Sequence, residues 1–247
     1  MSTSSGSTSS GSTSSGSTST GATTPTGTPS GSAAWTGQKG APTRMLLLRH
    51  GQTPLSVEKR YSGLGDPALT ERGEAQAAGA AGRLGALGGV AAVLTSPLRR
   101  ARQTAEAVAA VTGLPVEVRD GLIETDFGEW EGLTFVEARE RDPEVFARWL
   151  GSVDVAPPGG ESFADVGVRV SAERAKIVAD FPGRTVVVVS HVTPIKLIVQ
   201  EALAGGSSIL YRLHLDLASL CIADFFPDGG ASVRLVNDTS HVPGDPS

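Results

Sequence analysis

Three short apolar runs constrain the fold of this chain more than any other feature. They cover residues 45–48, 90–94 and 185–189, and polar residues follow each of them directly. Runs of this kind are typical of strands covered on both faces, because an exposed face would require polar residues at alternate positions. They therefore predict a parallel sheet that is buried between two layers.

Helical patterns separate these runs, since apolar residues recur every three or four positions between them. The patterns cover residues 69–87, 98–111, 161–181 and 194–203. Strands that alternate with helices are typical of the α/β class. We expect a three-layer α/β/α sandwich with a mostly parallel sheet.

The C-terminal region has a different pattern, with apolar and polar residues alternating at 213–216, 220–226 and 232–236. Alternation predicts strands with one exposed face. The sequence Pro-Asp-Gly-Gly at 227–230 favours a turn between the last two. We expect a hairpin or meander at one sheet edge, and a further short strand at 115–118.

The first 43 residues differ from the rest in composition. After Met1 they begin with three copies of STSSG and one of STSTG, and serine, threonine and glycine dominate the whole segment. Such a segment has too little apolar surface to offset the entropy lost on folding. We expect residues 1–43 to be a disordered tail or linker and residues 44–247 to form one domain.

Several classes of protein are disfavoured by composition. The formal net charge is −5, which argues against a nucleic-acid partner bound through this domain. The sequence has neither an apolar run long enough to span a membrane nor a secretory signal pattern. Cys221, the only cysteine, allows neither an internal disulfide nor a cysteine-based zinc site. We expect a cytoplasmic protein without a membrane partner.

Histidines and arginines follow the apolar runs. Arg49 and His50 follow the first run, a helix bearing Arg100 follows the second, and His191 follows the third. Ligands of open α/β sheets bind at the carboxyl ends of the strands, so these side chains are expected to converge. Arginine forks match phosphate oxygens, and a histidine among them is a candidate nucleophile. The pattern predicts a site for a phosphate ester.

Two further features would serve such a site. Ser96 and Pro97 resemble a helix N-cap and first helical residue, which would direct the positive end of a helix towards the crevice. An alkoxide leaving group also needs a general acid. The segment 121–132 contains four acidic residues, and position alone leaves the choice between Glu124 and Asp126 open.

Four motifs together resemble those of the histidine phosphatase superfamily, also called phosphoglycerate mutase-like. They are LRHGQT at 48–53, SPLRRARQTA at 96–105, the Glu-to-Gly segment at 124–132, and Ser-His at 190–191. They occur in the family's order across residues 44–247. The resemblance implies a phosphoglycerate mutase-like fold and a phosphoryl-transfer enzyme that requires neither a metal nor a cofactor.

The resemblance also implies a role for each matching residue. His50 matches the nucleophile that becomes a phosphohistidine, and Glu124 matches the proton donor. Arg49, Arg100 and His191 match the positions that hold the phosphate. The expected reaction is hydrolysis of a small-molecule phosphomonoester, of the acid phosphatase type. Under this interpretation the neighbouring Arg99 and Arg102 are ordinary charges on a helix surface.

Further positions are expected to contact phosphate or substrate. These are Thr53, Ser56, Ser62, Gly63 and Val192. Two of them depart from the family pattern, since many members have asparagine at the position of Ser56 and glycine at that of Val192. Both departures are expected to alter the pocket wall and leave the catalytic set in place.

Segments 124–134, 192–196 and 233–241 resemble more closely the acid phosphatase part of actinobacterial bifunctional ribonuclease H/acid phosphatase proteins. That part is similar to alpha-ribazole phosphatases. The resemblance implies a possible association with a ribonuclease H domain.

Two alternatives use the same motifs. A cofactor-dependent phosphoglycerate mutase would need the same residues, but such mutases carry a longer insertion between the acid and the second histidine. A non-catalytic module that binds phospholigands would be expected to lack the nucleophile or the acid. Among the remaining residues, His214 and His241 are expected to have structural or capping roles. Trp130 and Trp149 are expected to pack in the core, and the role of Phe127 stays open.

Overall fold

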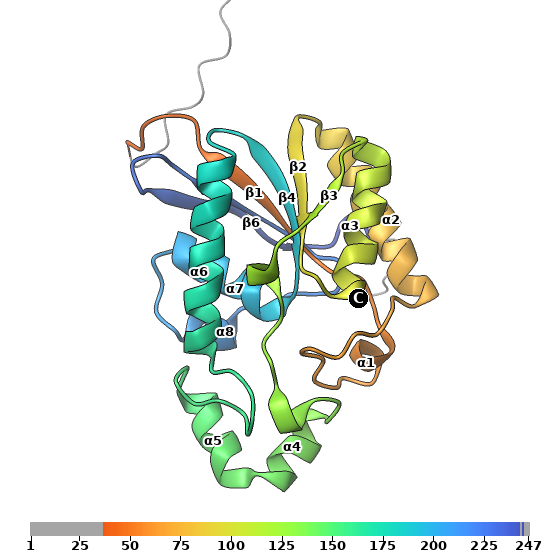
Figure 1. Cartoon of the computed structure of the whole chain (residues 1–247), viewed down its shortest axis with the longest axis vertical. Coiled ribbons are helices and arrows are strands. Elements are labelled where there is room, and N and C mark those ends of the chain that lie inside the picture. The colour runs from red at the N-terminus through yellow and green to blue at the C-terminus, as the bar shows by residue number, and fades with distance from the viewer. Residues whose placement is uncertain (1–36, 243, 245–247) are drawn as a thin grey trace, which may run out of the picture. The chain divides into compact units, whose positions relative to one another are not determined.

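The computed structural model describes residues 37–242 and 244. In this part of the chain a six-stranded sheet has the order β3-β2-β4-β1-β5-β6 (Figure 1). The strands are β1 (Thr43–Arg49), β2 (Val90–Thr95), β3 (Val116–Val118), β4 (Thr185–Ser190), β5 (Leu220–Phe225) and β6 (Ala231–Asp238). The first four strands are parallel to one another, and β5 is antiparallel to its neighbours β1 and β6. The predicted mostly parallel sheet is confirmed.

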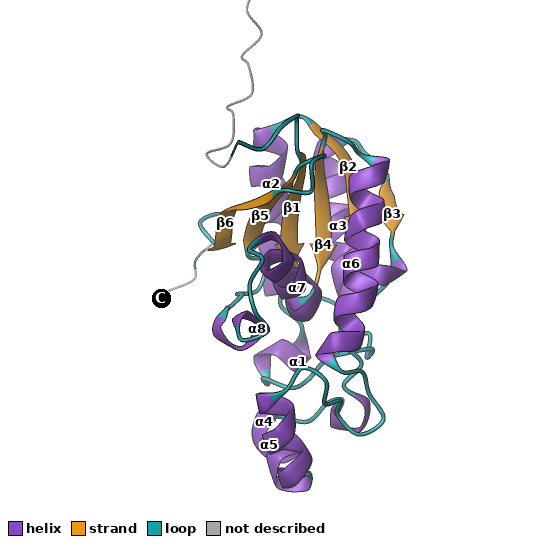
Figure 2. Ribbon diagram, turned by 90° about the vertical axis from the view of Figure 1, so that its left-hand side faces the viewer, coloured by secondary structure: helices purple, strands orange, loops and turns teal. Residues whose placement is uncertain are grey.

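Helices cover both faces of this sheet, which confirms the predicted three layers. One face carries α2 (Glu71–Leu87) and α3 (Arg99–Thr112), and the other carries α6 (Phe163–Asp180) and α7 (Val192–Ala202). Figure 2 shows α6 and α7 in front of the strands and α2 and α3 behind them. Alternate residues of each strand enter the two cores: in β1, Leu47 packs with the α6/α7 layer and Leu48 with the α2/α3 layer. Burial on both faces explains the unbroken apolar runs.

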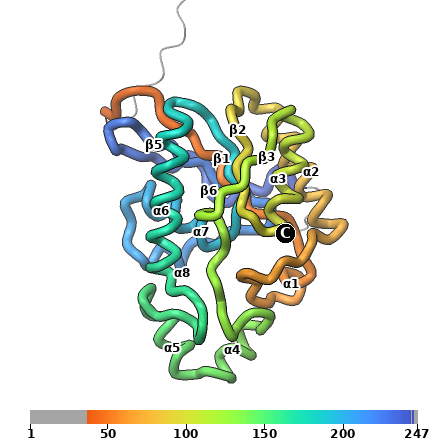
Figure 3. Tube along the Cα trace, viewed as in Figure 1, coloured from red at the N-terminus to blue at the C-terminus, as the bar shows by residue number. Residues whose placement is uncertain are grey.

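Short helices that the sequence did not predict lie beyond the carboxyl ends of the parallel strands. They are α1 (Pro54–Val57), α4 (Phe135–Arg141), α5 (Pro143–Gly151), α8 (Ile209–Arg212) and the 3-10 turns η1 (Asp120–Leu122) and η2 (Gly128–Trp130). Figure 3 traces the chain from β3 out to α4 and α5 and back into α6. This excursion has its own aromatic core, in which the Trp130 indole donates to Asp142 Oδ2 at 2.8 Å.

The C-terminal hairpin forms as expected, but the predicted strand at 213–216 is wrong. Phe226 N donates to Gly230 O at 2.8 Å and closes the turn between β5 and β6. Residues 213–216 are a loop instead, in which Asp216 N donates to the Asn237 side chain at 2.6 Å. Alternation alone did not distinguish a strand from a loop whose polar groups bond to side chains.

Residues before Arg44, the expected start of the domain, already make contacts with the sheet region. Thr43 is the first residue of β1 and is buried. Gln38 Nε2 donates to Ala231 O at 3.0 Å, and Lys39 N donates to Asp228 Oδ2 at 2.9 Å. Most of the expected tail, residues 1–36, lies outside the described residues. Within the described residues, every helix is too short or too polar to cross a membrane.

Candidate active site

The two histidines that follow strands lie side by side. His50 follows β1 and His191 follows β4, and their ring centroids are 5.1 Å apart. Arg49 pairs with Ser190 in the parallel register, so β1 and β4 end next to each other at the same edge of the sheet. His50 is 6% exposed and His191 is fully buried. The sheet therefore brings together residues that are far apart in sequence, as the strand-exit rule predicts.

The His50 ring is held with one nitrogen free. Its Nδ1 lies 2.8 Å from Gly51 O, so a neutral ring donates from Nδ1 and keeps the lone pair on Nε2. Burial, reinforced by the positive charges of Arg100 and Arg49, holds the pKa of His50 well below its usual range. The lowered pKa favours the neutral form of the His50 ring at neutral pH. The next residue, Gly51, lets the strand exit approach α2, because a Cβ there would collide with Gly73 O.

Ser96 has a different role from the one expected. The helix α3 begins at Arg99, and Leu98, in an extended conformation, is its N-cap. The expectation that Ser96 caps the helix and Pro97 is its first residue is therefore wrong. The Ser96 hydroxyl instead lies 2.7 Å from His191 Nε2. It fixes the orientation of the His191 ring, whose Nδ1 is buried without a hydrogen-bond partner in the described part of the chain.

The two arginines are buried beside the histidines. Arg49 donates from one terminal nitrogen to Leu215 O at 2.7 Å, and burial lowers its pKa to about 10, which leaves it charged at neutral pH. Arg100 is fully buried and donates to Gly65 O at 2.7 Å and to Ser62 O and Gly63 O at 2.9 Å. Arg100 thus holds the loop expected to contact substrate. The exposed Arg99 and Arg102 are surface charges on α3, as expected.

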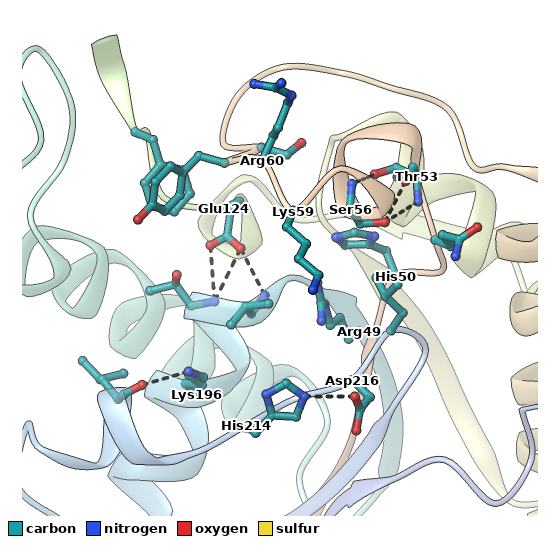
Figure 4. Close-up of a pocket in the computed structure, with 18 of the residues that line it drawn as sticks. Arg49, His50, Thr53, Ser56, Lys59, Arg60, Glu124, Lys196, His214 and Asp216 are labelled. Atoms are coloured by element: carbon teal, nitrogen blue, oxygen red, sulfur yellow. Dashed lines mark hydrogen bonds and ion pairs between the residues drawn. The ribbon is translucent and has the colours of Figure 1, made fainter. Parts of the chain in front are cut away.

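The structure separates the two candidate acids. Glu124 lines a cavity in front of His50, and its carboxylate accepts from Thr125 N at 2.9 Å. It also accepts from Val192 N at 3.1 Å and Thr193 N at 3.3 Å (Figure 4). The last two amides belong to the first turn of α7, which attracts negative charge. Asp126 instead accepts from Gly128 N at 2.8 Å and stabilises the turn into η2. Of the two, only Glu124 lines the cavity.

Arg169 of α6 holds the backbone that carries Glu124, and the sequence analysis missed it. Its guanidinium donates to Ile123 O at 2.6 Å, Glu124 O at 2.8 Å and Gly121 O at 3.2 Å. It also forms an ion pair with Glu161 at 3.0 Å. No sequence motif signals this contact, because Arg169 and Glu124 are 45 residues apart.

The cavity has a volume of about 1040 Å³, and we call the polar part of its lining the polar end and the part lined by rings the aromatic end. Its polar end contains most of the residues predicted from sequence: Arg49, His50, Thr53, Ser56, Ser62, Glu124 and Val192. Thr53 and Ser56 form a capping box that starts α1, so Ser56 also helps to shape the wall. Gly63, Arg100 and His191 lie behind this surface. Gly63 N donates to Glu131 Oε2 at 2.8 Å.

The other end of the cavity was not predicted. It is lined by Tyr61, Phe127, Trp149, Phe163, Leu210 and Tyr211, with Lys59, Arg60, Lys196 and His214 among the residues that line the rest. His214 lies in a loop and not in the expected strand; its side chain is 79% exposed and its Nε2 lies 2.9 Å from Asp216 Oδ1, so the expected structural role stays a prediction. His241 is half-buried, and its Nε2 lies 2.8 Å from Ala218 O. Trp149 packs as expected but also lines the cavity.

In residues 37–242 and 244, no three His, Cys, Asp or Glu side chains are grouped so that they could hold a metal ion.

Comparisons with known proteins place the chain in a family. Residues 45–239 match the model of the histidine phosphatase superfamily, branch 1. Bifunctional protein Rv2228c of Mycobacterium tuberculosis is 56% identical over 211 residues, which cover 85% of this chain and 58% of that protein. Phosphoserine phosphatase 1 of Hydrogenobacter thermophilus is 34% identical, covering 81% of this chain and 94% of that one.

Solved structures agree with the sequence comparisons. The alpha-ribazole phosphatase from Shigella flexneri has a TM-score of 0.72 and 27% identity, covering 80% of this chain and 97% of that one. Phosphoglycerate mutases are also among the relatives. The chain spans less than two thirds of the length of Bifunctional protein Rv2228c. The matched model and the relatives show that the chain belongs to the histidine phosphatase superfamily.

Proposed function

We propose that this chain hydrolyses phosphomonoesters through a phosphohistidine at His50, without a metal ion. One observation carries the proposal: among the buried side-chain atoms that have no hydrogen-bond partner in the described residues, three are donors that belong to the site around His50. They are Arg49 Nε, Arg100 Nε and His191 Nδ1. Buried polar groups are rarely left unpaired, and three that surround one histidine indicate a missing anionic ligand. A phosphate group matches these donors in charge and in number of oxygens.

The first step transfers the phosphoryl group to His50. The lone pair on His50 Nε2 attacks phosphorus in line with the leaving oxygen, a new N–P bond forms, and the P–O bond breaks. A protonated Glu124 gives its proton to the leaving oxygen, and the alcohol departs. Arg49, Arg100 and His191 stabilise the charge on the equatorial oxygens, a task of positioning and preorganised electrostatics.

The second step releases phosphate. Glu124, now a carboxylate, accepts a proton from water as the water oxygen attacks phosphorus. The N–P bond breaks, inorganic phosphate leaves, and His50 returns to its neutral form. Glu124 is suited to both steps because it lines the cavity while Arg169 and the first turn of α7 hold its backbone and carboxylate.

Trapping the intermediate tests this proposal. During turnover the enzyme is quenched in alkali, in which phosphohistidine survives, and is digested for mass spectrometry. We expect one phosphorylated peptide, containing His50, at a level that rises in a burst. Turnover with phosphate on another residue, or with no phosphoenzyme under single-turnover conditions, would contradict the assignment.

The same first step would serve a phosphoglycerate mutase, and mutases are among the relatives. The two activities differ in the acceptor, which is water in a phosphatase and a second hydroxyl group in a mutase. We expect phosphate release without any dependence on added bisphosphoglycerate. Interconversion of phosphoglycerates that requires bisphosphoglycerate would favour the mutase, and ligand binding without turnover would favour a non-catalytic module.

We further propose that the domain acts in the cytoplasm as one part of a longer protein whose other part is a ribonuclease H domain. Support comes from the relative named bifunctional, of which this chain matches 58%. The chain itself should neither cleave an RNA–DNA hybrid nor bind one at physiological salt. Cleavage or binding by this chain alone would count against that division of labour.

A further inference from the structure

Five aromatic side chains form one side of the cavity, and we call this set the aromatic wall. Its members are Tyr61, Phe127, Trp149, Phe163 and Tyr211. Each ring contacts the next: the centroid distances are 4.7 Å for Phe127–Tyr61, 6.0 Å for Tyr61–Trp149, 5.2 Å for Trp149–Phe163 and 6.2 Å for Phe163–Tyr211. The wall is thus a continuous surface of rings contributed by separate parts of the chain.

A second layer of rings supports the wall and is itself closed to the cavity. Trp130 is fully buried and Phe146 is 1% exposed. Trp130 contacts Trp149 edge-on at 5.4 Å, and Phe146 contacts Trp149 at 5.7 Å. Within the wall, Phe127 is 8%, Trp149 6% and Phe163 9% exposed, whereas Tyr211 is 40% exposed. A flat ligand would therefore stack mainly on Tyr211 and contact the small exposed parts of the other rings.

Two polar atoms of the wall, Tyr61 Oη and Trp149 Nε1, are buried without a hydrogen-bond partner among the described residues, and the other polar groups near the wall are mostly engaged. The lining carboxylates are already engaged: Glu124 accepts from backbone amides, and Asp216 accepts from Asn237 and pairs with His214. Lys196 Nζ donates to Leu210 O at 2.8 Å. A leaving group with many hydroxyl groups would lose its hydration here and regain few hydrogen bonds. A planar ring system would instead remove apolar surface from water and stack on the rings.

The wall is placed where a leaving group must go. Phe127 lies three residues after Glu124, and both line the same cavity. Figure 4 shows Glu124 and His50 on different sides of that cavity. The proposed proton transfer places the leaving oxygen at Glu124, so the group attached to that oxygen extends towards the wall.

We propose that the physiological leaving group carries a planar aromatic or heteroaromatic ring system that stacks on the aromatic wall. This inference rests on the proposed phosphatase function and goes beyond it, because it names the class of substrate. It separates such esters from phosphoserine, phosphoglycerates and simple sugar phosphates, which have no ring of this kind.

The test compares two esters with leaving alcohols of similar basicity. One is 2-(1-naphthyl)ethyl phosphate and the other is ethyl phosphate, so the ring is the main difference. Stacking and burial of a bicyclic ring are worth enough to raise kcat/KM about 10-fold or more. We expect that preference in the whole chain. Ribose 5-phosphate and phosphoserine should be hydrolysed no faster than ethyl phosphate.

Matched variants then locate the preference. Tyr211→Leu removes an exposed wall ring and should reduce the naphthyl preference about 3-fold or more. Tyr211→Phe keeps the ring and loses only the hydroxyl that donates to Trp149 O, so the preference should remain. Phe135→Leu is the control, because Phe135 is 46% exposed on α4 and lies outside the cavity lining. It should change neither rate.

The outcomes separate the two proposals. Three results would overturn the stacking proposal and leave the phosphatase proposal intact. They are equal kcat/KM for both esters, faster hydrolysis of a sugar phosphate, and a naphthyl preference that Tyr211→Leu does not reduce. Hydrolysis of no ester, with no phosphohistidine, would overturn both. Melting temperatures of the variants show whether a lost preference reflects a lost fold.

Discussion

The polar end and the aromatic end of the cavity are built in different ways. At the polar end, His50, His191 and Glu124 come from different strand exits and loops, and each is held by a hydrogen bond of 2.9 Å or less. At the aromatic end, rings pack mainly against rings, and the hydrogen bonds from these rings are Tyr211 Oη to Trp149 O and, in the supporting layer, Trp130 Nε1 to Asp142 Oδ2. Hydrogen bonds fix the chemistry within tenths of an ångström, whereas packing only shapes a surface.

The contrast implies that reaction and selectivity depend on separate parts of one cavity. Buried hydrogen-bonded groups tolerate little change, because each lost partner leaves another group unsatisfied. Aromatic packing tolerates exchange among apolar side chains of similar volume. Changes at the polar end should therefore abolish turnover for every ester, and changes at the aromatic end should alter which esters are preferred.

The largest effect is expected for His50→Ala. Without the imidazole no phosphoenzyme can form, so kcat should fall by about 10⁴-fold or more for every ester. Steady-state kinetics with naphthylethyl and ethyl phosphate checks this. Residual activity near that of the wild type would remove His50 from the mechanism and with it the contrast between the two ends.

Glu124→Gln should have the next largest effect, and its size should depend on the leaving group. General acid catalysis contributes about 10² to 10⁴-fold when the leaving oxygen is basic. Ethyl phosphate should therefore lose far more rate than p-nitrophenyl phosphate, whose leaving group needs little proton assistance. An equal loss on the two esters would assign Glu124 to binding instead.

Arg169→Gln should act through Glu124. Losing the three carbonyl contacts lets the Glu124 backbone move, and a misplacement of about 1 Å can cost about 10²-fold in rate. The loss should again be greater for ethyl than for p-nitrophenyl phosphate, with kcat affected more than KM. A uniform loss on both esters, accompanied by a lower melting temperature, would indicate a purely structural role.

Trp130→Phe tests the supporting layer of the aromatic end. It removes the bond to Asp142 and part of a fully buried ring, so the free energy of unfolding should fall by about 1–3 kcal/mol. Denaturant unfolding measures this. The phosphohistidine burst should persist, and a vanished burst in a folded variant would show that the two ends are coupled.

The smallest change is expected in the pH profile. A pKa of His50 below 6.5 means that the neutral, nucleophilic ring persists as the pH falls through 6.5, since protonation requires more acid. After correction for substrate ionisation, kcat/KM should stay level across that pH. A fall with a midpoint near 6.5 that persists in His191→Ala would indicate an ordinary, solvated nucleophile.

Local sequence patterns predicted the parts of the molecule where structure is local. Two-sided burial makes strand runs visible, and the strand-exit rule placed His50 and His191 at one crevice. The pattern failed at Ser96, because Leu98 is extended and the helix starts later than the Ser-Pro signal indicates. It failed again at 213–216, where Leu215 O accepts from Arg49 instead of a neighbouring strand.

Sequence patterns were sufficient to predict the three-layer fold and the two histidines, and the family motifs matched Glu124 to the proton donor. The folded structure added that Glu124, and not Asp126, lines the cavity, that Arg169 holds the Glu124 backbone and that distant rings form the aromatic wall. The physical reason is separation along the chain. Strands and caps depend on neighbours a few residues apart, whereas the wall joins rings from Tyr61 to Tyr211, whose contacts exist only after folding.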